Sequence, residues 1–231
     1  MATTHKEWAN QVLRRIDPAF RHRWVVYSDA VKNHLNPETI WIDCGCGDNE
    51  AVRAFGVQAN CAAGLDIQEP LTGGGNFVKG DIKRLPFASG CADLITLRFV
   101  VEHFPEVEAY FSEIDRVLRK NGKVIILTTN ILSPLIFLPR LVLPYPIKNW
   151  ILSRLFKVDS AEIFPTFHQL NSPGKFAKGI KNLHLQHLEF ISDLNYTRKW
   201  VFRILLFWHI LTRPAFLHKF RTNILAVLEK R

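Results

Sequence analysis

The sequence of 231 residues is poor in cysteine and in charge, and its N-terminus lacks the apolar run of a signal peptide. Only 22% of its residues are charged and 48% are hydrophobic, which excludes a disordered chain because disorder requires the opposite balance. The most apolar stretches, residues 131–147 and 200–211, are too broken or too short for a membrane span of about 20 residues. We therefore expect a globular protein in the reducing cytoplasm.

The cysteines are also too few and too widely spaced to form a metal site. The four cysteines are Cys44, Cys46, Cys61 and Cys91, and only the first two stand close together in the sequence. A zinc site generally requires four ligands, and we identify no second pair that would complete the set. We expect no bound metal.

Negative charge is scarce in the second part of the chain. Residues 1–130 carry 15 Lys and Arg against 16 Asp and Glu, whereas residues 131–231 carry 15 against 5. This asymmetry indicates an anionic partner for the second part, either a phospholipid surface, a phosphate-bearing substrate or nucleic acid, unless the basic surface is merely solvated. Nucleic acid is the weakest of these because large aliphatic residues separate the basic ones and no known binding module is recognisable.

Strands and helices alternate along most of the chain. Strands are predicted at residues 39–43, 61–66, 76–81, 92–98, 123–128, 187–192 and 223–229, and helices at residues 49–55, 108–118 and 172–181. Residues 6–35 have the pattern of one or two amphipathic helices broken near Pro18. This alternation predicts an α/β protein with a doubly wound, parallel sheet, whose ligand sites lie at the carboxyl ends of the strands.

The apolar stretches of the second part do not fit this alternation. Residues 131–147 contain four prolines, which forbid one regular helix. Residues 200–211 have the composition of a helix bordered by Arg198, Lys199, Arg203 and Arg213. Such a helix either lies in a membrane interface, with its basic side chains at the headgroups, or is an ordinary core helix.

A glycine-rich turn follows the first predicted strand. Residues 41–48 read WIDCGCGD, and Gly45 and Gly47 allow a tight turn that brings a ligand close to amides at a helix N-terminus. A dinucleotide-binding turn would have a third glycine where this chain has Glu50, whose charge would repel a pyrophosphate. The turn therefore disfavours hydride-transfer cofactors.

The order of the motifs resembles the class I S-adenosylmethionine-dependent methyltransferases, and among them the broad bacterial small-molecule group. The resemblance spans residues 38–130, and it departs from the family at Asn49, which replaces the usual last glycine and tolerates left-handed backbone geometry. It implies a mostly parallel, seven-stranded sheet with helices on both faces. The apolar and basic second part would add a helical insertion to that fold.

The resemblance assigns the cofactor site by position. It implies that Asp66 accepts hydrogen bonds from the two ribose hydroxyls and that Asp81 bonds the adenine amino group, with Ile67 and Ile82 beside them. Asp43 and the turn, with Arg98 and Phe99 after the fourth strand, would surround the methionine part of the cofactor. The whole implied set is Asp43, Cys44, Gly45, Cys46, Gly47, Asp66, Ile67, Asp81, Ile82, Arg98, Phe99 and His103.

Methyl transfer from a sulfonium requires chiefly that the acceptor be positioned, and a hydroxyl acceptor also benefits from a general base. His103, His168 and Tyr196 are the candidate bases, and His103 could equally shape the pocket wall. Residues 164–172 resemble a loop that covers the acceptor in related enzymes, although they could simply lead into the next helix.

We expect one methyltransferase domain over residues 1–231, with a helical cap at 1–37, a cofactor-binding core at 38–130 and acceptor-side or membrane-facing insertions at 131–175 and 193–221. S-adenosylmethionine is the expected cofactor. The expected acceptor is a small molecule, amphiphilic or lipid-linked, methylated on oxygen or nitrogen at the inner membrane face. A soluble sugar or metabolite is the alternative acceptor, and a non-catalytic binding protein of the same fold is the alternative class.

Overall fold

The computed structural model describes residues 5–71, 75–142, 165–194 and 198–231. The chain forms two compact units. The first unit comprises Met1–Val26, Asn130–Pro165 and Phe190–Asn223, and the second comprises Tyr27–Thr129, Thr166–Glu189 and Ile224–Arg231. The helix α2 (Arg23–Lys32) passes from the first unit into the second.

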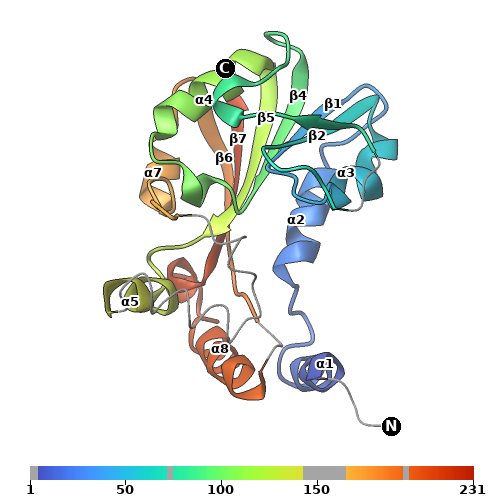
Figure 1. The fold of residues 1–231 in the computed structure, drawn as a ribbon. Coiled ribbons are helices and arrows are strands. Elements are labelled where there is room, and N and C mark those ends of the chain that lie inside the picture. Colours follow the sequence, from blue (N-terminus) through green and yellow to red (C-terminus); the bar gives the residue numbers. More distant parts are fainter. Residues whose placement is uncertain (1–4, 72–74, 143–164, 195–197) are drawn as a thin grey trace. The chain divides into compact units, whose positions relative to one another are not determined.

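A seven-stranded sheet forms the centre of the second unit (Figure 1). Its strands are β1 (Ile40–Cys44), β2 (Cys61–Asp66), β3 (Phe77–Lys79), β4 (Ala92–Arg98), β5 (Leu118–Thr129), β6 (Leu183–Ile191) and β7 (Asn223–Lys230). They lie in the order β3-β2-β1-β4-β5-β7-β6, and the pairings among β1 to β5 are parallel. The predicted doubly wound, mostly parallel sheet is confirmed.

The central strands are apolar on both faces, as expected for parallel strands that helices cover. Leu94, Ile95 and Leu97 on β4 and Ile125 on β5 are all buried. The covering helices include α3 (Glu50–Phe55), which contacts β2, and α4 (Val107–Val117), which contacts β5. Short 3-10 turns η1 (Gly56–Gln58), η2 (Ile82–Arg84) and η3 (Val101–His103) follow α3, β3 and β4, and α7 (Pro173–Ala177) precedes β6.

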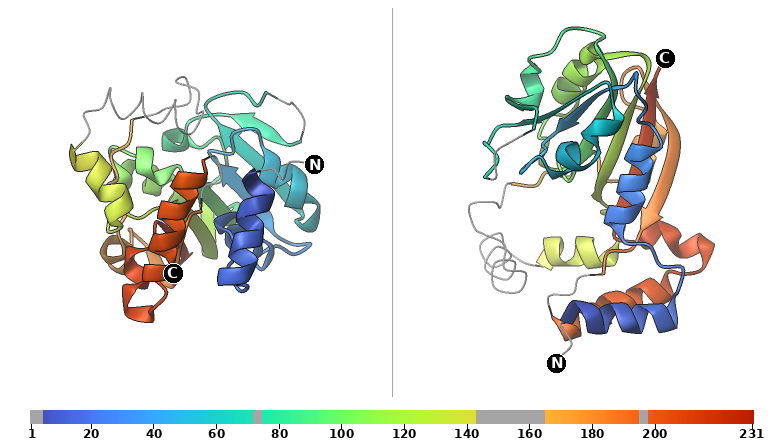
Figure 2. Two further views of the ribbon diagram at one scale, coloured as in Figure 1. Left: turned by 90° about the horizontal axis from the view of Figure 1, so that it is seen from below. Right: turned by 90° about the vertical axis from the view of Figure 1, so that its right-hand side faces the viewer.

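The first unit is helical, with α1 (His5–Ile16), α5 (Pro134–Val142), α8 (Lys199–Leu211) and the 3-10 segment η5 (Ala215–Phe220). Helices α1 and α8 lie side by side (Figure 2) and bury a small apolar core between them. Trp8 packs edge to face on Phe202 with ring centroids 5.3 Å apart. Among the described residues, no helix is long and apolar enough to cross a membrane.

Several element boundaries differ from the predictions. Helix α7 ends at Ala177 because Gly179 takes a φ of 73° and Ile180 then bridges to Leu183. Strands β5 and β6 begin earlier than predicted, and Pro139 lies within α5. The predicted helix at 200–211 is confirmed as α8, although only one of its faces is buried. Residues 143–147 of the proline-rich stretch, Phe164 and Tyr196 lie outside the described residues.

Candidate active site

Most of the predicted site residues lie at the carboxyl ends of neighbouring strands. Strand β1 pairs with β2 on one side and with β4 on the other, so the direction in which the chain crosses the sheet changes at β1. Such a switch point leaves room for a ligand beyond the strand ends. Asp43 lies near the end of β1, Asp66 ends β2 and Arg98 ends β4, which brings them to the same edge.

The turn after β1 has three residues in left-handed backbone geometry. They are Gly45 (φ 72°), Gly47 (φ 55°) and Asn49 (φ 58°). The prediction that Asn49 tolerates this geometry is therefore confirmed. The Asn49 side chain is buried and lies against Gly64 of β2, where a side chain would not fit because an added Cβ would be 2.1 Å from Asn49 Oδ1. Asn49 thus fixes the packing of the turn on β2.

Asp66 is bound to the turn through backbone amides. The Gly47 amide donates to Asp66 Oδ2 at 2.9 Å and the Gln68 amide donates to Asp66 Oδ1 at 3.0 Å. The Gly45 amide donates to the Leu65 carbonyl at 2.7 Å, which joins the same two segments. Each carboxylate oxygen accepts more than one hydrogen bond, so Asp66 keeps acceptor capacity for a ligand.

Asp43 is buried among polar side chains of the neighbouring strand. Thr96 Oγ1 donates to Asp43 Oδ1 at 2.6 Å and in turn accepts from Trp41 Nε1 at 2.9 Å. Burial raises the pKa of Asp43 to about 6, against the hydrogen bond from Thr96 and the positive charge of Arg98, which both lower it. Asp43 is therefore a carboxyl group with a titration point near neutrality inside the fold.

The two cysteines of the turn are packing residues. Burial raises the pKa of Cys46 to about 12 and that of Cys44 well above its usual value, so both remain thiols at neutral pH. A metal ligand must be a thiolate. In the part of the chain that the structure describes, no cluster of three or more His, Cys, Asp or Glu side chains could hold a metal ion.

The segment after β4 has a strained start. Phe99 has a φ of 57°, which is uncommon for a bulky residue, and its amide donates to the Leu127 carbonyl of β5 at 2.8 Å. The chain then forms η3, which ends at the half-buried His103. Strain of this kind persists where the surrounding structure enforces it, and it is frequent at functional sites.

A buried polar network, which the sequence did not reveal, joins η3 to the loop that contains His168. The Glu102 carbonyl accepts from the amides of Phe167 (2.7 Å) and His168 (3.1 Å). Glu102 Oε2 accepts from Thr128 Oγ1 at 2.9 Å, and Asn171 Nδ2 donates to the same hydroxyl at 2.6 Å. Glu102 thus accepts a hydrogen bond from the backbone of one candidate base, His168, and directly precedes the other, His103, in the chain.

Asp81, after β3, begins η2, and its Oδ1 accepts from the Lys83 amide at 2.9 Å. The two predicted apolar neighbours differ in exposure, with Ile67 55% exposed and Ile82 only 8% exposed. Only Ile67 therefore offers a broad apolar surface to a ligand ring. Tyr110, which the sequence did not reveal, has a raised pKa through burial and the negative charge of Asp81, and it stacks on Phe104.

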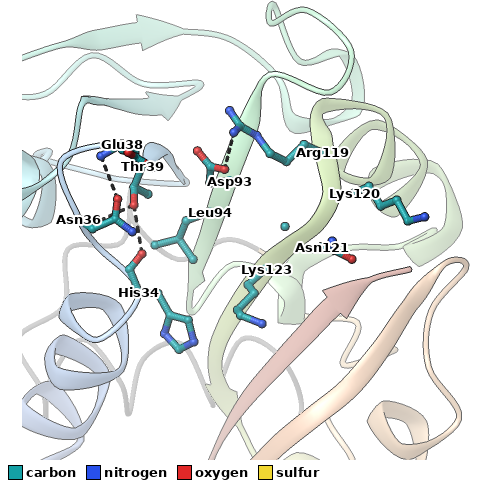
Figure 3. Close-up of a pocket in the computed structure, with 11 residues that line it drawn as sticks. His34, Asn36, Glu38, Thr39, Asp93, Leu94, Arg119, Lys120, Asn121 and Lys123 are labelled. Atoms are coloured by element: carbon teal, nitrogen blue, oxygen red, sulfur yellow. Dashed lines mark hydrogen bonds and ion pairs between the residues drawn. The ribbon is translucent and has the colours of Figure 1, made fainter.

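A pocket of about 270 Å³ lies at the opposite edge of the sheet, beside Thr39 and Asp93 at the amino ends of β1 and β4 (Figure 3). Asp93 Oδ2 accepts from the Ile40 amide at 2.7 Å, and its other oxygen pairs with Arg119 at 2.7 Å. These bonds hold the strands β1, β4 and β5 together. The pocket contains none of the predicted site residues.

The strand order and the turn at the carboxyl edge are those of the class I, Rossmann-like methyltransferase fold. Residues 42–126 match the family described as "Methyltransferase domain". A ubiquinone/menaquinone biosynthesis C-methyltransferase, UbiE of Rhizobium johnstonii, is 30% identical over an alignment of 122 positions that covers 44% of this chain. The match covers 47% of that relative, so the chain spans about half of its length.

Solved structures share the fold at low sequence identity. A methyltransferase from Mesorhizobium loti, described as S-adenosylmethionine dependent, has a TM-score of 0.59 and 14% identity over 88% of this chain and 95% of its own. The geranyl diphosphate C-methyltransferase of Streptomyces coelicolor has a TM-score of 0.55 and 14% identity over 89% of this chain and 77% of its own. At this identity the likeness establishes the fold alone.

Proposed function

We propose that this protein transfers a methyl group from S-adenosylmethionine to a small acceptor. The observation that carries the proposal is the Asp66 carboxylate, which the Gly47 and Gln68 amides hold beside the glycine turn. A carboxylate in this position suits a neutral diol because it accepts two hydrogen bonds at once. The structure of the Streptomyces coelicolor neighbour contains S-adenosyl-L-homocysteine, which supports the same cofactor class here.

The residues of the turn fit such a cofactor. Apart from Gly47 and its two chain neighbours, no residue has an atom within 4 Å of the position that a Cβ on Gly47 would occupy, so the chain leaves open space beside this glycine. Asp66 and Ile67 would hold the ribose, Asp81 the adenine, and Asp43 with the backbone of Gly45 the methionine part. When bound, the cofactor supplies an electrophilic methyl group on a sulfonium. Asp43 opposes that positive charge once it is ionised.

For the acceptor we propose a small amphiphilic or lipid-linked molecule, with oxygen or nitrogen as the methylated atom. The excess of basic residues in residues 131–231 and the apolar surface of the first unit support this class. The Streptomyces coelicolor neighbour was crystallised with geranyl diphosphate, an amphiphile, and two named relatives are C-methyltransferases. Carbon is therefore the main alternative atom, and a soluble sugar or metabolite is the alternative acceptor.

We assign His103 and His168 as the candidate general bases for a hydroxyl acceptor. A histidine exchanges its proton near neutral pH and is therefore suited to this task. Their backbones both adjoin Glu102, which supports a common position. If either acts as a base, its Gln variant will lose turnover while it keeps cofactor affinity. A variant that loses both would instead assign the histidine to the pocket wall.

Isothermal titration with S-adenosylmethionine tests the cofactor site. We expect binding by the parent chain and a loss of at least about tenfold in Asp66→Ala, because the diol loses both of its acceptors. Glu69→Ala is the matched control, since Glu69 is an exposed acid three residues further on that pairs with Lys79. Absence of binding by the parent, or equal binding by both variants, would contradict the proposal.

Profiling of metabolites and lipids tests the acceptor. A strain that lacks the protein should accumulate one compound that is about one methylene lighter than its product in the parent strain. Complementation with the parent chain should restore the heavier compound, and complementation with Asp66→Ala should not. Restoration by Asp66→Ala would contradict methyl transfer and favour a non-catalytic role.

A further inference from the structure

The exposed face of α8 is unusually apolar for a helix that already has a buried face. Val201, Phe202, Leu206 and His209 are buried in the first unit. The opposite face exposes large apolar side chains, namely Trp200, Ile204, Phe207, Ile210 and Leu211. Trp200, Ile204, Phe207 and Leu211 follow one another at intervals of four, three and four residues, which places them in a single stripe along the helix.

The side chains of this stripe have much of their apolar surface in contact with water, which is unfavourable. Phe207 is 67% exposed and Trp200 is 52% exposed. Phe216 in η5, a few residues after α8, is 76% exposed and adds a further aromatic side chain to the same unit. Isolated apolar side chains on a surface are ordinary, whereas a contiguous stripe of large ones indicates an interaction site.

The charged residues near the stripe in the sequence are all basic, which favours an anionic partner. Residues 198–223 contain six Lys and Arg and no Asp or Glu. Arg198 and Lys199 lie at the start of α8, Arg203 within it, and Arg213 just beyond its end. Lys199 and Arg203 also lie over the Trp8 ring of α1, at 5.3 Å and 5.9 Å from its centroid, which holds these two cations in place beside the helix.

We propose that the exposed stripe of α8 docks the protein on an anionic lipid surface. In this arrangement the helix lies in the plane of the interface, its aromatic and aliphatic side chains enter the boundary between headgroups and acyl chains, and the basic residues contact lipid phosphates. A helix of 13 residues suits this position and is too short to span a bilayer. The inference does not depend on methyl transfer, because the lipid itself is the ligand of this surface.

Co-sedimentation with vesicles tests the docking. The full chain is mixed with vesicles of phosphatidylglycerol and phosphatidylcholine in equal parts, and in parallel with phosphatidylcholine alone. We expect binding to the anionic vesicles, weaker binding to the neutral ones, and release as salt is raised. Equal binding to both lipids, or binding that salt does not change, would overturn the proposal.

Two variants separate the apolar and the basic contributions. Phe207→Gln should weaken binding to anionic vesicles by about tenfold or more, because one large side chain no longer leaves water. Its matched control is Val57→Gln, since Val57 is 91% exposed but lies in the second unit. Arg198→Gln combined with Arg213→Gln should weaken binding and reduce its dependence on salt. Lys120→Gln combined with Lys178→Gln serves as the charge control.

Two further measurements distinguish lipid from a second copy of the chain as the occupant of the stripe. Bromine-labelled lipid should quench tryptophan fluorescence in the parent chain, and this quenching should decrease in Trp200→Phe. Analytical ultracentrifugation without lipid reports whether a second copy of the chain covers the stripe. A dimer that Phe207→Gln dissociates, together with no binding to vesicles, would overturn the proposal in favour of self-association. Urea unfolding at an unchanged midpoint verifies that each variant is folded.

Discussion

At the scale of one residue, Asp43 lowers the stability of the fold at a position where we propose that it assists cofactor binding. Its pKa is about 6 in the folded protein against 3.8 for an ordinary aspartate. Between these values the folded state keeps a proton that the unfolded state has lost, so stability falls as pH rises through this window. The cost at neutral pH is about 3 kcal/mol. We expect Asp43 to be retained despite this cost because its ionised form attracts the sulfonium of the proposed cofactor.

Asp43→Asn tests both effects directly. Asparagine keeps an oxygen that can accept from Thr96, but it does not titrate. We expect the variant to be more stable than the parent near pH 7, by up to about 3 kcal/mol, and the difference to vanish near pH 4. Urea unfolding at both pH values measures this. The same variant should bind S-adenosylmethionine more weakly, and a variant that is less stable at both pH values would contradict the prediction.

The two glycines of the turn differ in what surrounds them. A Cβ on Gly45 would lie 2.3 Å from Val100 Cγ2, whereas a Cβ on Gly47 would meet nothing within 4 Å. Both glycines have positive φ, so Gly47→Ala should cost about 1 kcal/mol through strain alone, and Gly45→Ala should cost about 1–3 kcal/mol more. Unfolding of the double variant Gly45→Ala with Val100→Ala provides the check. If removing the Val100 methyl groups restores nothing, the overlap is not the cause.

At the scale of the elements, the sequence predicted best those segments whose structure is determined locally. Strands β2 and β4 were predicted with their observed bounds because each is a short buried run that ends at a polar residue. Helix α7 was predicted too long because the left-handed conformation of Gly179 ends it, and glycine permits that conformation without requiring it. Boundaries of this kind depend on tertiary contacts.

In the candidate site too, some residues could be predicted from the sequence and others could not. Asp43, Asp66 and the glycine turn were recognisable because each stands at a strand end in the order that the family resemblance implies. The partners of these residues were not recognisable. Thr96 lies 53 residues from Asp43, and Asn171 lies 43 residues from Thr128, so these hydrogen bonds exist only after the strands are assembled. A Thr within an apolar strand carries no signal of its own.

The helix α8 is attached to the first unit by a buried histidine. His209 Nε2 lies 2.9 Å from Asp17 Oδ2, and His209 Nδ1 lies 3.0 Å from Ser192 Oγ. Burial lowers the pKa of His209 below 6.5, although Asp17 raises it. The unfolded chain therefore takes up a proton first as pH falls below about 6.5, and the histidine contributes less stability at acid pH.

His209→Gln should lower stability by about 1 kcal/mol at neutral pH, because buried hydrogen bonds are lost. The difference from the parent should shrink as pH falls toward 5, since glutamine does not titrate. Hydrogen exchange of the α8 amides measures this locally. His184→Gln is the control, because His184 is exposed on β6 in the second unit. A difference that grows as pH falls would contradict the proposed sign.

At the scale of the whole molecule, the net charge of +9 is the sum of a nearly neutral region, residues 1–130, and a strongly basic one, residues 131–231. The cofactor candidates lie in the second unit, on a nearly neutral stretch of sequence, whereas the basic and apolar α8 belongs to the first. The proposed cofactor site and the proposed lipid-docking surface therefore lie in different units. Each can therefore be tested while the other is absent.

Ligand-induced stabilisation tests this separation. At a concentration of S-adenosylhomocysteine about a hundredfold above its Kd, the free energy of unfolding should rise by about 2.7 kcal/mol in the parent chain, because the ligand binds only the folded state. Asp66→Ala should show little of this gain, whereas Phe207→Gln should show all of it. Hydrogen exchange should slow at the amides of residues 45–49 and 66–68, which contact or flank Asp66, and remain unchanged along α8. If hydrogen exchange slowed equally at the α8 amides, the two sites would be coupled. If the ligand did not raise the free energy of unfolding of the parent chain, the cofactor assignment would be contradicted.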